Sequence, residues 1–250
     1  MKPIPGLAVG TRFFGKNPAK DLPRIESFIH AAVKVGSVYV AVRTEADSIG
    51  SLTFAKKNFP VVDAFSVTPW GERDFALPLN VIVSRAVKDG ASRLLLASAE
   101  FPPQHHQVEQ LLAHVGDDTL VAGARFSEHE FDEGERIGTG TTVPWNTFSI
   151  WNLDYLGRCG FPLVGDAPFD PKMAGVEEVT TIALYQQLGH PITPEAKLVS
   201  IEGFFKEWNM DGWDQDRIDR HLAKIASKKG RPAAQLAWAK FHLPRVTHIA

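Results

Sequence analysis

Polar side chains follow the short apolar runs of this sequence, at the places where strands would end. In an open parallel sheet, ligands bind beyond the carboxyl ends of the strands, so a binding site is expected there. An arginine at such a place suits a diphosphate, because its guanidinium pairs directionally with phosphate oxygens, although a solvated loop charge accounts for a single arginine equally well. The candidates are Thr11, Arg12, Arg43, Glu45, Asp47, Ser98 and Glu100.

Two adjacent glutamates, Glu177 and Glu178, open a helical pattern that continues to Leu188. Negative charge stabilises the first turn of a helix, and this is one account of the pair. The other is catalysis, because a carboxylate within hydrogen-bond reach of a hydroxyl can remove its proton. Neighbouring helix residues point about 100° apart, so we expect only one of the two to face a cleft.

Several tryptophans are candidates for a sugar site. The apolar face of a sugar ring stacks on an indole, while core packing is the default account of each tryptophan. The segment from Gly203 to Trp213 is aromatic and glycine-bounded, which fits a lid over a bound substrate or a contact between copies of the chain equally well. The tryptophans concerned are Trp145, Trp151, Trp208 and Trp213.

The elements that must position these residues alternate between β-rich runs and amphipathic helical patterns, as is typical of parallel strands joined by helical crossovers. The run Arg93 to Ala97 is the most continuously apolar and is expected mid-sheet, buried on both faces. The glycines and threonines of Gly134 to Thr142 predict a mobile loop. Strands are expected at residues 7–9, 38–42, 61–67, 93–97 and 119–124. Helices are expected to begin at Pro23, at Asp47 or Ser48, and after Pro103, and to carry apolar stripes at 79–86, 176–184 and 218–225.

The composition excludes several classes of protein. A chain of 250 residues with 44% hydrophobic residues buries a substantial core. Its 27 basic and 29 acidic residues lack the basic excess of a general nucleic-acid binder. The single cysteine, Cys159, excludes an intrachain disulfide. Without a signal-peptide pattern or an apolar stretch of about 20 residues, a soluble, cytoplasmic protein with no transmembrane segment is predicted.

The order of segments from residue 7 to about 202 resembles the GT-A fold of family-two-type glycosyltransferases. The resemblance is carried by Arg43 to Gly50, Pro78 to Ala86, Leu94 to Glu100, Val143 to Ile150 with Cys159 to Pro162, and Gly175 to Glu178. It implies an α/β, Rossmann-like fold with a mostly parallel central sheet flanked by helices over residues 1–202. Residues 203–250 would form a helical C-terminal extension packed on the same domain.

The resemblance also implies roles for particular residues. In the family, the acidic turn after the second strand holds the base and ribose of the sugar nucleotide, and a helix that begins near an asparagine, here Asn80, passes behind the diphosphate. Glu177 or Glu178 falls where the family has its general base. Trp145 and Asn146 fall on the acceptor side.

The metal motif departs from the family pattern. Where the family has Asp-x-Asp, this chain has Ser98-x-Glu100, so a hydroxyl replaces one carboxylate ligand of the Mn²⁺ or Mg²⁺ ion that bridges the two phosphates. Three outcomes are open. The ion is held weakly, chiefly by substrate phosphates; or Arg12, Arg43 or Arg73 supplies the positive charge in its place; or turnover is lost.

These patterns predict a glycosyltransferase of the hexosyltransferase type, which binds a nucleotide-sugar donor and transfers the sugar to an unknown acceptor hydroxyl. The altered metal motif favours an alternative, a GT-A scaffold of impaired activity that binds a nucleotide sugar or a partner protein. A third hypothesis comes from Gly230 to Ala239, which resembles a helix of aldo-keto reductase barrels. The Tyr, Lys, Asp and His tetrad of those enzymes is not recognisable here.

Overall fold

The computed structural model describes residues 2–13, 18–43, 62–67, 70, 74–189, 193–204, 207, 210 and 214–250. The helix expected at 47–59 lies outside these residues, as do the candidates Glu45, Asp47 and Arg73. Within the described chain, every helix is too short or too polar to cross a lipid bilayer.

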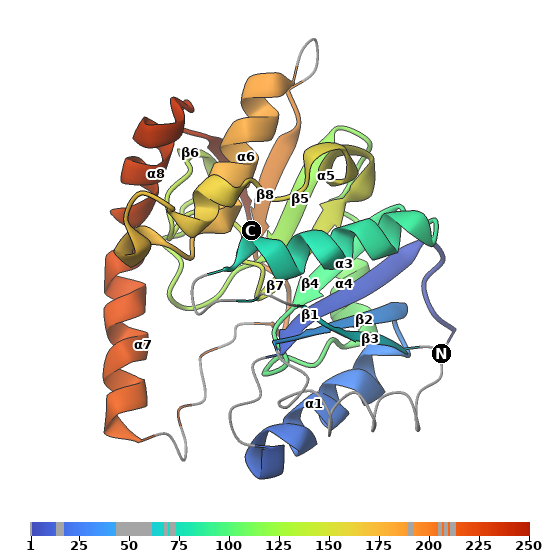
Figure 1. Cartoon of the computed structure of the whole chain (residues 1–250). Helices are drawn as coiled ribbons and strands as arrows, with labels where there is room; N and C mark the ends of the chain where they lie inside the picture. Colours follow the sequence, from blue (N-terminus) through green and yellow to red (C-terminus); the bar gives the residue numbers. More distant parts are fainter. Residues whose placement is uncertain are drawn as a thin grey trace.

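A mixed sheet forms the centre of the protein, with the strand order β3-β2-β1-β4-β7-β5-β8-β9-β6 in the described residues (Figure 1). Strands β1/β2, β2/β3, β1/β4, β5/β8 and β8/β9 pair in parallel, whereas β4/β7, β5/β7 and β6/β9 are antiparallel. The predicted mostly parallel sheet is therefore confirmed. The strands are β1 (Leu7–Phe13), β2 (Ser37–Val42), β3 (Val62–Ser66), β4 (Arg93–Ala97), β5 (Thr119–Ala124), β6 (Gly134–Ile137), β7 (Phe148–Asn152), β8 (Glu195–Val199) and β9 (Arg245–Ile249).

Helices cover this sheet. Helix α3 packs on β1 and β2 and crosses in front of the strands in Figure 1, while α4 packs on β5 and β7. Helices α7 and α8 lie together at one side of the molecule. The α-helices are α1 (Pro18–Ala32), α3 (Ala76–Lys88), α4 (His105–Leu112), α5 (Leu153–Cys159), α6 (Glu177–Leu188), α7 (Gln215–Lys228) and α8 (Arg231–Ala239). Two 3₁₀ turns are η1 (Leu163–Asp166) and η2 (Pro171–Met173).

The strand β4 lies in the middle of the sheet, between β1 and β7. Its side chains Leu94, Leu95 and Leu96 alternate between the two faces, and each is at most 1% exposed. Both faces of a strand at this position are covered, which favours apolar residues throughout its buried part, Leu94 to Ala97. The sequence prediction for this strand is confirmed.

The sheet is open, with β3 and β6 at its two ends in the described residues. An aldo-keto reductase requires a closed barrel of parallel strands surrounded by helices. The hypothesis of an aldo-keto reductase, based on Gly230 to Ala239, is therefore wrong. That stretch does contain a helix, α8.

Two other expectations were wrong in detail. Pro23 does not open the first helix but lies inside it; the helix begins five residues earlier, at another proline, Pro18. The loop predicted at 134–142 begins with an edge strand, β6, whose exposed polar residues give no apolar signal. The segment 203–250 contains the helices α7 and α8, and it also supplies β9, which lies between β8 and β6 in the sheet. The division of the chain at residue 202 stays a prediction.

Gly36 lies where the chain enters β2 beside β1, and a Cβ atom there would be 2.3 Å from the carbonyl oxygen of Leu7. A backbone atom cannot move aside as a flexible side chain does. We therefore expect Gly36→Ala to lower the free energy of unfolding by about 1 to 3 kcal/mol, as overpacking does, in urea unfolding experiments. The matched control is Gly230→Ala, because no atom lies within 4 Å of its added Cβ. Equal stability of the two variants would contradict this account.

Candidate active site

A cavity of about 310 Å³ lies at the carboxyl ends of β1 and β4. This is the position at which open α/β sheets bind ligands. Its walls come from β1, the turn after β4, the turn before β7, the start of α6 and one face of α7. The predicted site residues that line it are Thr11, Arg12, Ser98, Glu100, Asn146, Glu177 and Glu178.

The Glu177 carboxylate is almost fully buried, with 2% of the residue exposed. Its Oε1 atom lies 2.8 Å from Nη1 of Arg12, which comes from β1 and also donates to the carbonyl oxygen of Phe75 at 2.9 Å. The Asn146 side-chain amide donates to the same carboxylate oxygen at 3.4 Å. A guanidinium partner stabilises the charged form of a buried carboxylate, so this ion pair favours a negative charge on Glu177 at the cavity wall.

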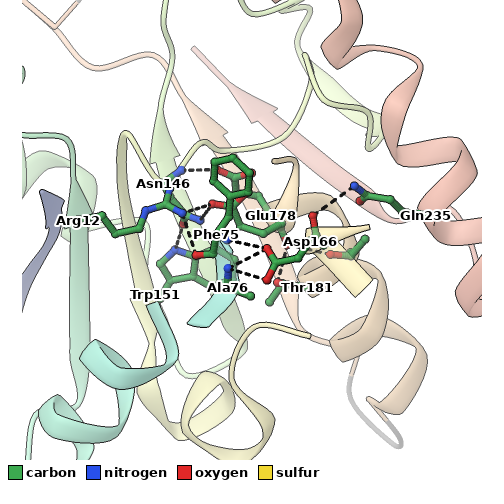
Figure 2. Close-up of polar contacts among 12 residues, drawn as sticks. Arg12, Phe75, Ala76, Asn146, Trp151, Asp166, Glu178, Thr181 and Gln235 are labelled. Carbon is green, nitrogen blue, oxygen red and sulfur yellow. Dashed lines mark hydrogen bonds and ion pairs between the residues drawn. The ribbon is translucent and has the colours of Figure 1, made fainter. Parts of the chain in front are cut away.

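Glu178 has a different environment. Its Oε1 atom accepts a 2.8 Å hydrogen bond from the backbone N–H of Asn146 (Figure 2). Burial, and then the neighbouring charge of Glu177, raise the pKa of Glu178 to about 7. Both glutamates line the same cavity. Our expectation that only one would face it was wrong, because Glu177 is the first residue of α6 and helical side chains tilt toward the N-terminus.

Asn146 connects the two glutamates to the sheet. Its Oδ1 atom accepts a hydrogen bond from the indole Nε1 of Trp151 at 2.9 Å (Figure 2). Its backbone N–H donates to Glu178, and its side-chain Nδ2 donates to Glu177. Trp151 is a fully buried residue of β7, so this contact fixes the amide. The orientation of both carboxylates therefore depends on the turn before β7.

Thr11 is another residue that lines the cavity. The residue is 1% exposed, and its Oγ1 atom has no hydrogen-bond partner among the described residues. Buried polar atoms nearly always have a partner, and an orphan one at a cavity wall indicates a group that a ligand satisfies. Thr11 donates or accepts, so it suits a phosphate or sugar oxygen.

The place of the metal motif is occupied by an ion pair. Oε1 of Glu100 lies 2.9 Å from Nη1 of Arg24 in α1, and its other oxygen accepts from the Ser98 hydroxyl. Among the described residues, no group of three or more His, Cys, Asp or Glu side chains is placed to hold a metal. A divalent ion needs several oxygen ligands, and the single carboxylate here already has a guanidinium partner. These residues do not fit a divalent ion.

Three predicted site residues do not line the cavity. Asn80 instead fixes the turn after α5, accepting from the backbone N–H of Phe161 at 2.7 Å and donating to its carbonyl oxygen at 2.9 Å. Arg43 donates to the carbonyl oxygen of Trp70 at 3.3 Å. Trp145 is 2% exposed and donates to the carbonyl oxygen of Gly140 at 2.8 Å, behind the cavity wall.

Sequence analysis missed several residues of the site. Lys228 and His221 line the cavity from α7, two helical turns apart on one face, but nothing in their spacing points to a ligand.

Asp166 supports the site from behind and was also missed. It accepts from the backbone N–H groups of Phe75 and Ala76, at 2.8 and 3.0 Å, and so caps the start of α3 from another part of the chain (Figure 2). Burial raises the pKa of Asp166 to about 6.

No family model matches the sequence, and no curated protein matches it. The fold is that of the GT-A glycosyltransferases. The mannosyltransferase PcManGT from Pyrobaculum calidifontis, solved with GDP-Man and Mn²⁺, is similar with a TM-score of 0.56 over 94% of this chain and 70% of its own, at 14% identity. TarS of S. aureus is similar with a TM-score of 0.53 at 12% identity; the match covers 91% of this chain and 43% of TarS, less than half of that protein.

The pairing of Arg12 with Glu177 predicts a pH-dependent stability. Arg12→Met leaves a buried carboxylate without this cation, which costs about 3 kcal/mol where the carboxylate is ionised. Losing the cation raises the pKa of Glu177, so at pH 5 the group takes up a proton and the loss is smaller than at pH 8. Urea unfolding at both pH values measures it. Adding Glu177→Gln to the variant should restore most of the stability at pH 8, and an equal loss at both pH values would contradict the pairing.

Proposed function

We propose that this protein transfers a sugar from a nucleotide-diphospho-sugar to the hydroxyl of an acceptor, as a glycosyltransferase of the hexosyltransferase type. One observation carries the proposal: in a GT-A fold, a buried carboxylate with a pKa near neutrality, Glu178, lines the cavity at the carboxyl ends of the strands. A general base works best when its pKa lies near the working pH. The solved structure of PcManGT with GDP-Man supports this class of donor.

The proposed step divides the work between the two glutamates. The acceptor oxygen forms a bond to the anomeric carbon, the bond from that carbon to the diphosphate oxygen breaks, and the hydroxyl proton passes to Glu178. Glu177 keeps its negative charge through Arg12 and raises the pKa of its neighbour. Glu177 is thus a positioning and charge-setting residue. Asn146 holds Glu178 at 2.8 Å through its backbone N–H.

Replacing the base tests this assignment directly. Glu178→Gln keeps the size of the side chain and an oxygen that accepts from the backbone of Asn146, but it cannot take a proton. We expect the transfer rate to fall by about 10² to 10⁴-fold, while donor affinity stays nearly unchanged. Transfer of labelled sugar from UDP- and GDP-sugars to a panel of acceptors gives the rate. The exposed Glu202→Gln is the control, and full activity of Glu178→Gln would exclude the base role.

The pH profile separates the two glutamates. Only the carboxylate form of Glu178 is a base, so kcat/KM should fall about tenfold per pH unit below pH 7 and level off above it. Part of the raised pKa of Glu178 is due to the charge of Glu177. Glu177→Gln should therefore shift the midpoint of the profile to lower pH. A midpoint that moves upward, or stays in place, would contradict the coupling.

A second function is favoured by one observation, the ion pair between Arg24 and Glu100 at the place of the metal motif. In this alternative, the protein binds a nucleotide sugar as a scaffold and does not turn it over. Thermal shifts with UDP-, GDP- and CMP-sugars, combined with the transfer assay, distinguish the two functions. Stabilisation by a nucleotide sugar without transfer to any acceptor would favour the scaffold.

A further inference from the structure

We propose that the donor's diphosphate is bound here without a divalent ion, and that the ammonium group of Lys228 supplies the positive charge that the ion supplies in related folds. This inference rests on the proposed function, because it concerns the same donor. The altered metal motif left three outcomes open. This inference selects the second, in which a positively charged side chain replaces the ion. The side chain is not one of the three arginines considered in the sequence analysis but Lys228.

The first support is the state of Glu100, the carboxylate that the resemblance assigned to a metal. One of its oxygens pairs with Arg24 at 2.9 Å and the other accepts from Ser98. Arg24 is itself held in place by Asp21, 3.0 Å away on the same helix. A divalent cation at Glu100 would have to displace a guanidinium and then stay beside it. Like charges at that separation repel, so the ion pair disfavours a metal.

The second support is the placement of Lys228. It is the last residue of α7 and lines the cavity, with Nζ 3.2 Å from the centroid of the Trp145 ring. The indole is fixed from behind by its hydrogen bond to the carbonyl oxygen of Gly140. An ammonium on an aromatic face is attracted by the ring while its other N–H groups point away from it. Trp145, expected to contact the acceptor, thus supports a cation instead.

Gly140 also fixes the backbone of Lys228. A Cβ atom at Gly140 would lie 2.1 Å from the Lys228 carbonyl oxygen, so the turn after β6 and the end of α7 meet at a distance that only glycine allows. The same residue therefore positions both the indole and the backbone of the lysine. A cation held in this way loses little further freedom when it binds an anion.

The third support is the orphan hydroxyl of Thr11, buried at the wall of the same cavity. A hydroxyl donor and an ammonium on one cavity suit phosphate oxygens. Arg12 follows Thr11 on β1 and lines the same cavity, but its charge is balanced by Glu177. The positive charge that the proposal requires for a diphosphate is therefore assigned to Lys228, with the Thr11 hydroxyl as a hydrogen-bond donor.

Calorimetry with UDP, GDP and inorganic pyrophosphate tests the proposal, in buffer with EDTA and in buffer with Mn²⁺. We expect the Kd of the bound nucleotide to agree within about twofold between the buffers. Lys228→Met keeps the aliphatic stem and removes the charge, and should weaken diphosphate binding by about 10- to 100-fold, the value of a charged hydrogen bond. Lys228→Arg should restore most of the affinity. Thr11→Val should weaken binding while raising the melting temperature, because it removes an unsatisfied hydroxyl.

Lys229→Met is the matched control, because the adjacent Lys229 is exposed and pairs with Glu130 outside the cavity. Its Kd should equal that of the unmodified protein. Binding that requires Mn²⁺, or a folded Lys228→Met variant that binds as tightly as the unmodified protein, would overturn the inference and leave the proposed function intact. If Lys228→Met fails to fold, the comparison of EDTA with Mn²⁺ and the Thr11→Val variant still decide. The absence of any binding in both buffers would overturn both proposals.

Discussion

Two adjacent carboxylates at the start of α6 are buried, and the site is arranged around this burial. A buried charge is costly unless a cation or hydrogen-bond donors compensate it. Arg12 from β1 compensates Glu177, and the backbone of Asn146 before β7 compensates part of the charge of Glu178. The start of α6 is therefore tied to two strands that are not neighbours along the chain. The cavity lies where these three elements meet, so its shape depends on the same contacts.

Around these contacts, polar side chains fix the backbone rather than a ligand. Asp166 caps α3 across 90 residues of sequence, and Asn80 of α3 holds the turn at Phe161 through both its oxygen and its nitrogen. Gly160 makes this possible, because its φ of +68° and its approach to Asn80 leave no room for a side chain. The resemblance assigned Asn80 to the helix behind the diphosphate, and this role stays a prediction. In the structure the Asn80 side chain supports the backbone at Phe161, as a polar residue near a site often does.

The sequence predicts the interior of the sheet better than its edge. The strands β4 and β5 were found with their observed bounds, because the buried part of a central strand is a nearly continuous apolar run. The strands β6, β8 and β9 were missed, since each mixes charged and apolar residues and two of them form the far edge. Thr11 and Arg12, in the last part of β1, and Ser98 and Glu100, after β4, were found because each pair follows a short apolar run. Arg24 and Lys228 were not, because their partners lie far away in sequence and no local pattern marks a helix residue that faces a cavity.

The altered metal motif and the ion pair at Arg24 are physically linked. Two carboxylates at positions 98 and 100 would repel each other and would be stabilised by a cation of charge +2. A serine at position 98 removes one negative charge and donates its hydroxyl to the remaining carboxylate, which then needs only a single positive charge. Arg24 supplies that charge from α1. The loss of one ligand thus changes the whole charge balance at this place, and under our proposal the positive charge for a diphosphate comes from elsewhere on the cavity wall, where α7 presents Lys228.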